Sequence, residues 1–216
     1  MPRRDSHESR GREGGRPGRG GRHGPPGREG RPPRPSPEER LSRLLAYVLR
    51  HHPEEFGLEL DARGAIHLDA LIEALRQRPG FEDLARERIA ALVAGGPGAT
   101  RFAIEDDTIR ARYGHSLPQP IQYDPAEPPP FLFHGTTPAA AEQVLAEGLT
   151  AGQRQRVHLS VDTPVAREVG RRHCPEPVIL QIDTECSSKG GVRFYRGGPS
   201  VWLADDIPPQ CITRME

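Results

Sequence analysis

This sequence of 216 residues has little lysine, little cysteine and no long apolar run. Lys189 is the single lysine among 30 basic residues. The cysteines, Cys174, Cys186 and Cys211, are odd in number and form no Cys-x-x-Cys pair, which argues against a zinc ribbon and a disulfide scaffold and favours a reducing cytoplasm. No apolar run could span a membrane, and the N-terminus has no signal-peptide core. The sequence therefore predicts a soluble, cytoplasmic protein.

Several kinds of site are also missing from the sequence. It has no nucleophilic serine or cysteine motif, no metal-ligand cluster and no P-loop, and no Gly-x-Gly-x-x-Gly follows a predicted strand, which excludes a Rossmann nucleotide site. What it has instead are four arginine- and histidine-containing stretches: Leu-Arg-His-His at 49–52, Ile-Arg-Ala-Arg-Tyr-Gly-His-Ser at 109–116, Phe-His-Gly-Thr at 133–136 and Arg-Gln-Arg-Val-His-Leu-Ser at 154–160. Such residues, without a carboxylate pair, suit a doubly charged phosphate.

The N-terminal segment differs in composition from the rest. Residues 1–40 hold eleven arginines against six acidic residues, together with nine glycines and eight prolines. A segment with so little apolar surface cannot offset the entropy of ordering, so we predict a disordered tail over 1–38. Two interpretations stay open: weak, salt-sensitive affinity for nucleic acid, or a non-functional tail from an arginine-rich genome.

The next segment, 39–116, predicts three helices and a hairpin. Apolar residues at helical spacing begin at Leu41 and continue to Leu49, and Pro53 ends that helix. Further helices are expected at 69–76 and about 82–94, the last ending at Gly95-Gly96, and a hairpin at 102–104 and 108–111. Three helices followed by a hairpin describe a winged-helix lobe.

Six prolines between 117 and 130 predict a stiff linker. Beyond it, the pattern predicts strands at 131–134, 157–161, 178–182, 192–195 and 201–203, another near Cys211, and two helices at about 138–147 and 164–172. Many short strands with two helices indicate an α+β lobe over 131–216.

Each motif also has a structural explanation. Arg50 and His51 end the first helix, where basic side chains often serve only as solvated caps. Arg110 and Arg112 can form an exposed basic wing, and His158 and Ser160 can form the solvated face of a strand. The helix terminus favours a protonated His51 whereas Arg50 opposes it, and the sequence does not rank the two effects.

Across residues 39–214 the chain resembles the RNA 2′-phosphotransferase family. The resemblance is carried by Tyr-Val-Leu-Arg-His-His-Pro at 47–53, Ile-Arg-Ala and Gly-His-Ser within 109–116, Phe-His-Gly-Thr at 133–136, Val-His-Leu-Ser at 157–160 and Val-Trp-Leu at 201–203. It implies an α+β protein with an N-terminal winged-helix lobe, an ADP-ribosyltransferase-like C-terminal lobe, and NAD⁺ consumed as a co-substrate, with no metal. The chain departs from the family at Arg112-Tyr113, where Asn-Gln is usual, and at Ser200, where Gly is frequent.

The same resemblance assigns the site residues. The catalytic residues it implies are Arg50, His51, Arg110 and Arg154, and the NAD-binding residues are His134, Gly135, Thr136, His158, Leu159, Ser160 and Val201. His52, Arg112 and Arg156 are left with supporting or surface roles.

The implied reaction moves an internal 2′-phosphate from RNA to NAD⁺. The phosphate first displaces nicotinamide to give an ADP-ribosylated RNA, and the second step releases ADP-ribose 1″,2″-cyclic phosphate. Three alternatives remain open: ADP-ribosylation of terminal phosphates on DNA or RNA, a non-catalytic winged-helix nucleic-acid binder, and ADP-ribosylation of protein. The last is disfavoured because Val201 stands where a catalytic glutamate is expected.

Overall fold

Helix α1 begins at a complete capping box. The structure, a computed structural model, describes residues 34–95 and 99–215. Ser36 accepts from the Glu39 amide, Glu39 accepts from the Ser36 amide, and Pro37 opens helix α1 (Pro37–Arg50). The helix therefore starts within the predicted tail segment, of which residues 1–33 lie outside the described residues, as does the predicted helix end at Gly96.

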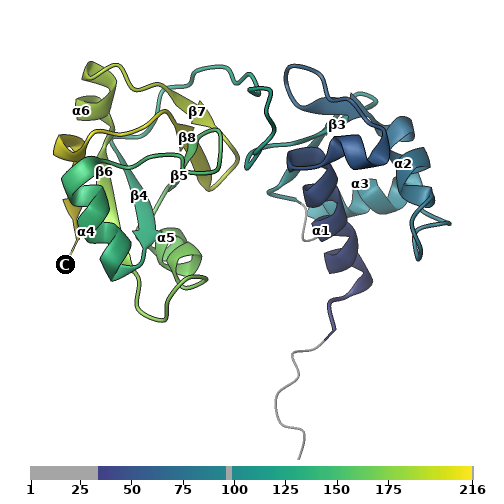
Figure 1. Ribbon diagram of the computed structural model, residues 1–216, viewed down its shortest axis with the longest axis horizontal. Helices are drawn as coiled ribbons and strands as arrows, with labels where there is room; N and C mark the ends of the chain where they lie inside the picture. Colours follow the sequence, from purple (N-terminus) through teal and green to yellow (C-terminus); the bar gives the residue numbers. More distant parts are fainter. Residues whose placement is uncertain (1–33, 96–98, 216) are drawn as a thin grey trace, which may run out of the picture. The chain divides into compact units, whose positions relative to one another are not determined.

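The first half of the described chain surrounds a three-stranded antiparallel sheet of order β1-β3-β2 (Figure 1). Its strands are β1 (Ala65–His67), β2 (Phe102–Glu105) and β3 (Thr108–Ala111), and its helices are α1, α2 (Leu68–Arg76) and α3 (Arg86–Gly95), with a 3-10 turn η1 (Pro53–Phe56). The predicted helices and hairpin are confirmed, except that α3 begins at Arg86 and not at about residue 82. Strand β1 is an addition that pairs Ile66 with Ile109.

The second half contains a six-stranded sheet of order β7-β8-β5-β4-β6-β9, in which every pairing is antiparallel (Figure 1). Its elements are β4 (Phe131–Thr136), α4 (Pro138–Glu147), β5 (Val157–Ser160), α5 (Thr163–Gly170), β6 (Val178–Asp183), α6 (Thr184–Lys189), β7 (Phe194–Arg196), β8 (Val201–Ala204), η2 (Pro209–Cys211) and β9 (Ile212–Arg214). The α+β class is confirmed.

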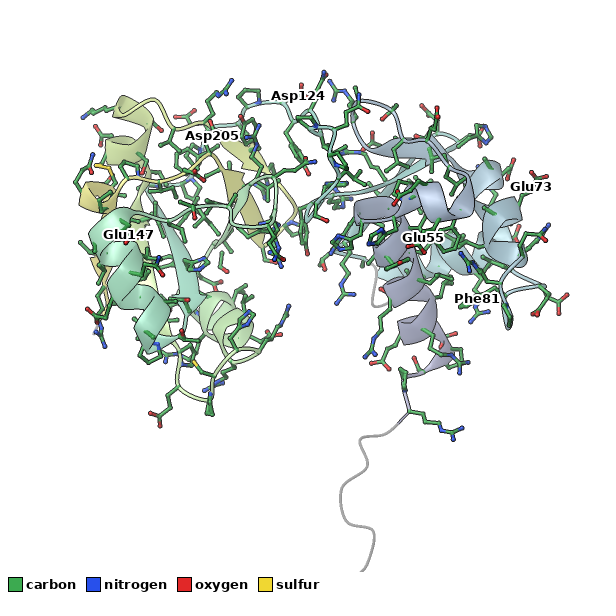
Figure 2. All side chains as sticks on the ribbon, in the orientation of Figure 1. Glu55, Glu73, Phe81, Asp124, Glu147 and Asp205 are labelled. Carbon is green, nitrogen blue, oxygen red and sulfur yellow. A yellow bond between two sulfur atoms is a disulfide. The ribbon has the colours of Figure 1, made fainter. Side chains whose placement is uncertain are left out.

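The proline-rich segment is anchored at several points along its length. The amide of Gln122 donates to the carbonyl of Ala62, and the amide of Ala126 donates to the carbonyl of Phe194. Asp124, labelled in Figure 2, accepts two hydrogen bonds from the guanidinium of Arg63. This segment is therefore held in place by hydrogen bonds. The predicted division into domains at 116, 117–130 and 131 stays a prediction.

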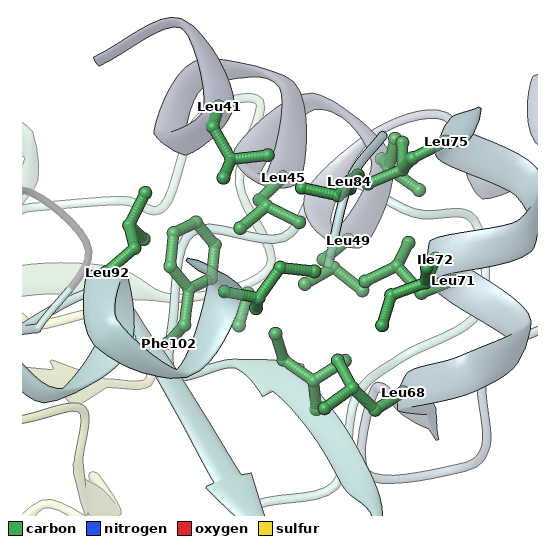
Figure 3. Packing of buried hydrophobic residues seen from close by; sticks show 14 residues of the cluster. Leu41, Leu45, Leu49, Leu68, Leu71, Ile72, Leu75, Leu84, Leu92 and Phe102 are labelled. Atoms are coloured by element: carbon green, nitrogen blue, oxygen red, sulfur yellow. The ribbon is translucent and has the colours of Figure 1, made fainter. Parts of the chain in front are cut away.

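Each sheet has its own apolar core. Figure 3 shows the first, in which Leu45 and Leu49 of α1 pack with Leu71 of α2 and Phe102 of β2. The second core joins Leu132, Leu159 and Trp202 of the large sheet to Ala141 of α4. The helical spacing of α1 and the alternation in β5 thus bury the side chains that those patterns predict.

Two expectations are corrected. The odd cysteine count predicts no disulfide framework, yet Cys186 and Cys211 are joined by a disulfide with their Cα atoms 5.6 Å apart, and Cys174 is free. The inference of a reducing compartment loses the support it took from the cysteines. The large sheet carries α6 as a third helix where two were predicted. No helix in the described part of the chain is long and apolar enough to cross a bilayer.

Candidate functional site

The guanidinium of Arg50, at the end of α1, lies over two aromatic rings. Its Cζ atom lies 5.0 Å from the centroid of the Tyr113 ring and 5.9 Å from that of Phe102. Its Nε and Nη2 atoms are buried and have no hydrogen-bond partner among the described residues. Burial is the largest cause of a lowered pKa for this guanidinium, and the charges of Arg101 and Arg154 add to it. An anion bound here would satisfy the free N–H groups and relieve that electrostatic cost.

His51 is tied to the segment that follows β3. Its Nδ1 atom lies 2.8 Å from the hydroxyl of Ser116, whose amide donates to the carbonyl of Arg50. Burial lowers the pKa of His51, and the nearby charges of Arg50, His52 and Arg154 lower it further. These effects outweigh the helix terminus, so the neutral imidazole predominates at pH 7 in the unliganded protein.

Arg110 is paired in this structure. Its Nη2 atom donates to Glu105 at 2.9 Å across the hairpin turn, and this ion pair lowers the pKa of the Glu105 carboxyl. Arg110 still adds to the positive field around His115. His115 is 2% exposed, and burial first, then Arg50, lowers its pKa to about 4. Among the four predicted catalytic residues, Arg110 thus has a carboxylate partner.

Arg154 is exposed, and its neighbour fixes the backbone beside it. The Gln155 side-chain amide donates to the carbonyls of Leu117 and Gln119 and accepts from the amide of Ile121, at 2.8 to 2.9 Å. The backbone amide of Gln155 also donates to the carbonyl of His115. After burial, the charge of Arg154 is among the causes that lower the pKa values of Arg50, His51, His134 and His158. Arg154 is therefore within electrostatic range of all four groups.

His134 and His158 are neutral imidazoles, and each is hydrogen-bonded to a backbone carbonyl. Nδ1 of His134 lies 3.0 Å from the carbonyl oxygen of His158, and Nδ1 of His158 lies 2.9 Å from that of Arg156. A carbonyl accepts, so each Nδ1 carries the proton and each Nε2 is left as an acceptor. Burial and then Arg154 lower the pKa of His158 to about 3, and burial lowers that of His134. The Nε2 atom of His158 is buried without a partner among the described residues.

The remaining predicted nucleotide-binding residues belong to the strands on either side of these histidines. Ser160 of β5 pairs with both Phe133 of β4 and Val201 of β8. Gly135 is required by packing, because a Cβ atom there would lie 1.9 Å from the carbonyl oxygen of Ala166 in α5. Leu159 is in the core, and Thr136 ends β4. The sheet thus collects these residues on three adjacent strands.

Three residues to which the motifs assign no role organise this site. Tyr113 lies between Arg50 and His158, with the His158 ring centroid 5.7 Å away at an interplanar angle of 72°. Ser116 contacts His51, and Gln155 fixes the loop of Arg154. All three lie inside the predicted motifs, but only spatial contacts distinguish them. The demoted residues make local contacts: His52 with Glu54, Arg112 with the carbonyl of Phe102, and Arg156 with Asp205.

The sequence of this chain is matched by the model of a known protein family. The model described as "RNA 2'-phosphotransferase, Tpt1 / KptA family" matches residues 36–206, which include every predicted site residue. The chain belongs to the RNA 2′-phosphotransferase family. The resemblance expected from the motifs is therefore confirmed over most of the described chain.

Relatives from archaea and bacteria agree with this assignment. A protein of Thermococcus kodakarensis is 42% identical over 175 residues, 81% of this chain and 96% of the relative. A protein of Bacillus thuringiensis is 38% identical over 172 residues, 80% and 92% of the two chains, and one of Agrobacterium fabrum is 41% identical over 175 residues, 80% and 91%. Each of these proteins is named a probable RNA 2′-phosphotransferase.

Proposed function

We propose that this protein is an NAD⁺-dependent RNA 2′-phosphotransferase. Its substrate is RNA with an internal 2′-phosphate, and NAD⁺ is consumed as the acceptor. The products are RNA with a free 2′-hydroxyl, nicotinamide and ADP-ribose 1″,2″-cyclic phosphate, formed through an ADP-ribosylated RNA. In this proposal the first sheet and its helices are a winged-helix lobe, and the six-stranded sheet is an ADP-ribosyltransferase-like lobe.

The single observation that carries the proposal is the buried, unpartnered guanidinium edge of Arg50. The described ion pairs occupy several arginines, among them Arg63, Arg86, Arg110, Arg156, Arg193 and Arg214, but neither Arg50 nor Arg154. Unpaired guanidinium groups suit the planar, bidentate recognition of a phosphate. We assign Arg50 and Arg154, with Arg110 once it exchanges Glu105 for substrate, to the 2′-phosphate.

The two histidines suit a different part of the reaction. An imidazole whose Nε2 is an acceptor cannot donate to a phosphate oxygen, but it can accept from a hydroxyl group. The buried, unpartnered Nε2 atom of His158 therefore fits a ribose hydroxyl of NAD⁺. We assign His134 and His158 to the NAD⁺ pocket, with Ser160 and Val201 on the adjoining strands. NAD⁺ supplies an electrophilic ribose carbon, which a phosphate dianion can attack without a general base.

His51 is the proposed general acid toward the departing RNA oxygen. In the unliganded protein burial and Arg50 lower its pKa, so the ring is mostly neutral at pH 7. A phosphate dianion bound beside His51 would raise that pKa and favour the protonated ring, which can donate the proton that the second step needs. Ser116 fixes the ring through Nδ1 and leaves Nε2 free to deliver it.

The decisive experiment incubates the protein with NAD⁺ and a 2′-phosphorylated oligoribonucleotide, scoring nicotinamide and the cyclic phosphate. The same RNA without the 2′-phosphate is the matched control. We expect both products from the first RNA and neither from the second.

The other outcomes separate the alternatives. A stable adduct on a 5′-phosphorylated strand, without cyclic product from the 2′-phosphorylated RNA, would make the protein a terminal-phosphate ADP-ribosyltransferase. RNA binding without any consumption of NAD⁺ would leave a nucleic-acid binder and refute the proposal.

A further inference from the structure

The segment that follows β3 wraps the end of helix α1. The amide of Ser116 donates to the carbonyl of Arg50, and Gly114 adopts a φ of 88°, in the left-handed region. A Cβ atom at Gly114 would lie 3.3 Å from Nη1 of Arg50, so the backbone turn is adjacent to the guanidinium. Tyr113 enters this turn and places its ring 5.0 Å from Cζ of Arg50.

Aromatic rings can hold the Arg50 guanidinium without repelling a phosphate, as a carboxylate would. A buried guanidinium needs a favourable partner, and an ion pair is the usual one. A carboxylate would occupy the N–H groups and repel an incoming phosphate. The ring faces of Tyr113 and Phe102 attract the cation through their quadrupoles. Unlike a carboxylate, they do not occupy the N–H groups of the guanidinium with hydrogen bonds. Arg50 is thus held in place while Nε and Nη2 keep no hydrogen-bond partner among the described residues.

The same ring also contacts the nucleotide side of the site. The Tyr113 and His158 rings meet edge to face, with centroids 5.7 Å apart. Tyr113 therefore touches one residue assigned to the phosphate and one assigned to NAD⁺. Among the described contacts, its ring is the group that joins Arg50 to His158.

We propose that Tyr113 is a positioning residue that couples the phosphate site to the NAD⁺ site by holding Arg50 and His158 against one aromatic ring. The inference rests on the proposed function. Tyr113 itself contacts neither reacting atom in this assignment. It acts by restricting the rotamers of Arg50 and by packing against the edge of His158. The aromatic ring, and not the phenol hydroxyl, is the active part.

The test compares Tyr113→Phe with Tyr113→Leu, each alone and with Arg50→Ala. The measured quantities are the affinity for a 2′-phosphorylated oligoribonucleotide without NAD⁺, the affinity for its unphosphorylated twin, and the KM for NAD⁺. We expect Tyr113→Phe to stay within about twofold of the unsubstituted protein, and Tyr113→Leu to weaken phosphate-dependent binding about tenfold. The KM for NAD⁺ should rise in the leucine variant and not in the phenylalanine variant.

The double variants decide between positioning and simple stability. If Tyr113 acts through Arg50, Tyr113→Leu should add less than about twofold to the RNA-binding defect of Arg50→Ala. An undiminished effect in that background, or equal defects in the phenylalanine and leucine variants, would overturn the proposal. Tyr113→Gln, which also lacks a ring, replaces the leucine variant if the latter unfolds. Failure of the proposed function would show separately, as an unsubstituted protein that releases no nicotinamide.

Discussion

Two arginines in this protein lie over tyrosine rings at the same distance, and each has a buried Nε without a partner among the described residues, but they differ in their pairing with a carboxylate. Cζ of Arg50 is 5.0 Å from the centroid of Tyr113, and Cζ of Arg156 is 5.0 Å from that of Tyr195. Arg156 also pairs with Asp205, which is labelled in Figure 2 and binds Arg193 as well. Arg50 has no such carboxylate among the described residues. The tyrosine contact is common to both, so we expect the carboxylate to distinguish an arginine that stabilises the fold from one that binds a ligand.

The largest test of this comparison replaces each arginine with alanine. Arg50→Ala should slow formation of the cyclic product about a hundredfold, roughly 3 kcal/mol of barrier, because a preorganised donor to the phosphate is lost. Arg156→Ala should keep turnover within about fivefold and lower the melting temperature instead. Single-turnover rates and thermal melts of the same preparations measure both. Equal rate losses in the two variants would contradict the distinction.

The second test concerns Arg154, the other arginine of the site outside the described ion pairs. Arg154→Ala should slow attack on phosphorus more than release of nicotinamide, so ADP-ribosylated RNA should accumulate to tens of per cent of the substrate. Gel separation of labelled RNA follows the intermediate over time. Arg214→Ala, which removes a cation paired with Glu142 far along the chain, is the matched control. Complete turnover without any intermediate would remove Arg154 from the second step.

The sequence predicted most of the elements because their patterns are local. The helical spacing of α1, for example, is contained in 14 adjacent residues. Strand β1 was missed because Ala65–His67 is too short to show alternation, and its identity comes from pairing with β3 about 40 residues later. Helix α6 was missed because its Thr-Glu-Cys-Ser-Ser-Lys sequence favours caps and turns, and Asp183 caps it.

The sequence marks the motifs of the candidate site but not their contacts. Arg50, His134 and His158 stand out by their motifs, and their roles stay a prediction. Nothing local says that Gln155 binds the backbone at 117–121, or that Arg110 pairs with Glu105 in the unliganded protein. The prediction about the cysteines was wrong for the same reason, because Cys186 and Cys211 come together through the packing of α6 against η2. Long-range geometry decides each of these cases.

A third test removes the carboxylate from the structural arginine pair. Asp205→Asn should lower the free energy of unfolding by about 1 to 3 kcal/mol, because Arg156 and Arg193 then lack their partner. Asp205 is 24% exposed in its side chain, so the pair is partly shielded from solvent. Urea unfolding measures the change. Asp124→Asn is the control, since the pair with Arg63 has side chains 60% and 77% exposed and should contribute less than about 1 kcal/mol.

The smallest test uses pH to separate the buried histidines from the exposed ones. The folded-state pKa values of His158 and His115 are lowered to about 3 and about 4, mainly by burial. The unfolded chain binds the proton near pH 6.5, so between pH 6.5 and 4 the unfolded state holds more protons and stability falls as pH falls. From pH 7 to pH 5 each histidine should cost about 1 to 2 kcal/mol.

The pH dependence can be assigned to individual residues by substitution. His158→Asn keeps a side-chain N–H near the carbonyl of Arg156 but cannot be protonated, so the loss of stability between pH 7 and pH 5 should shrink by about 1 to 2 kcal/mol. Urea unfolding at both pH values measures the difference. If His158→Asn lost as much stability on acidification as the unsubstituted protein, the ring would be protonated in the folded state. His158 would then be a cation beside Arg154, and its place as a neutral acceptor for a ribose hydroxyl would be untenable.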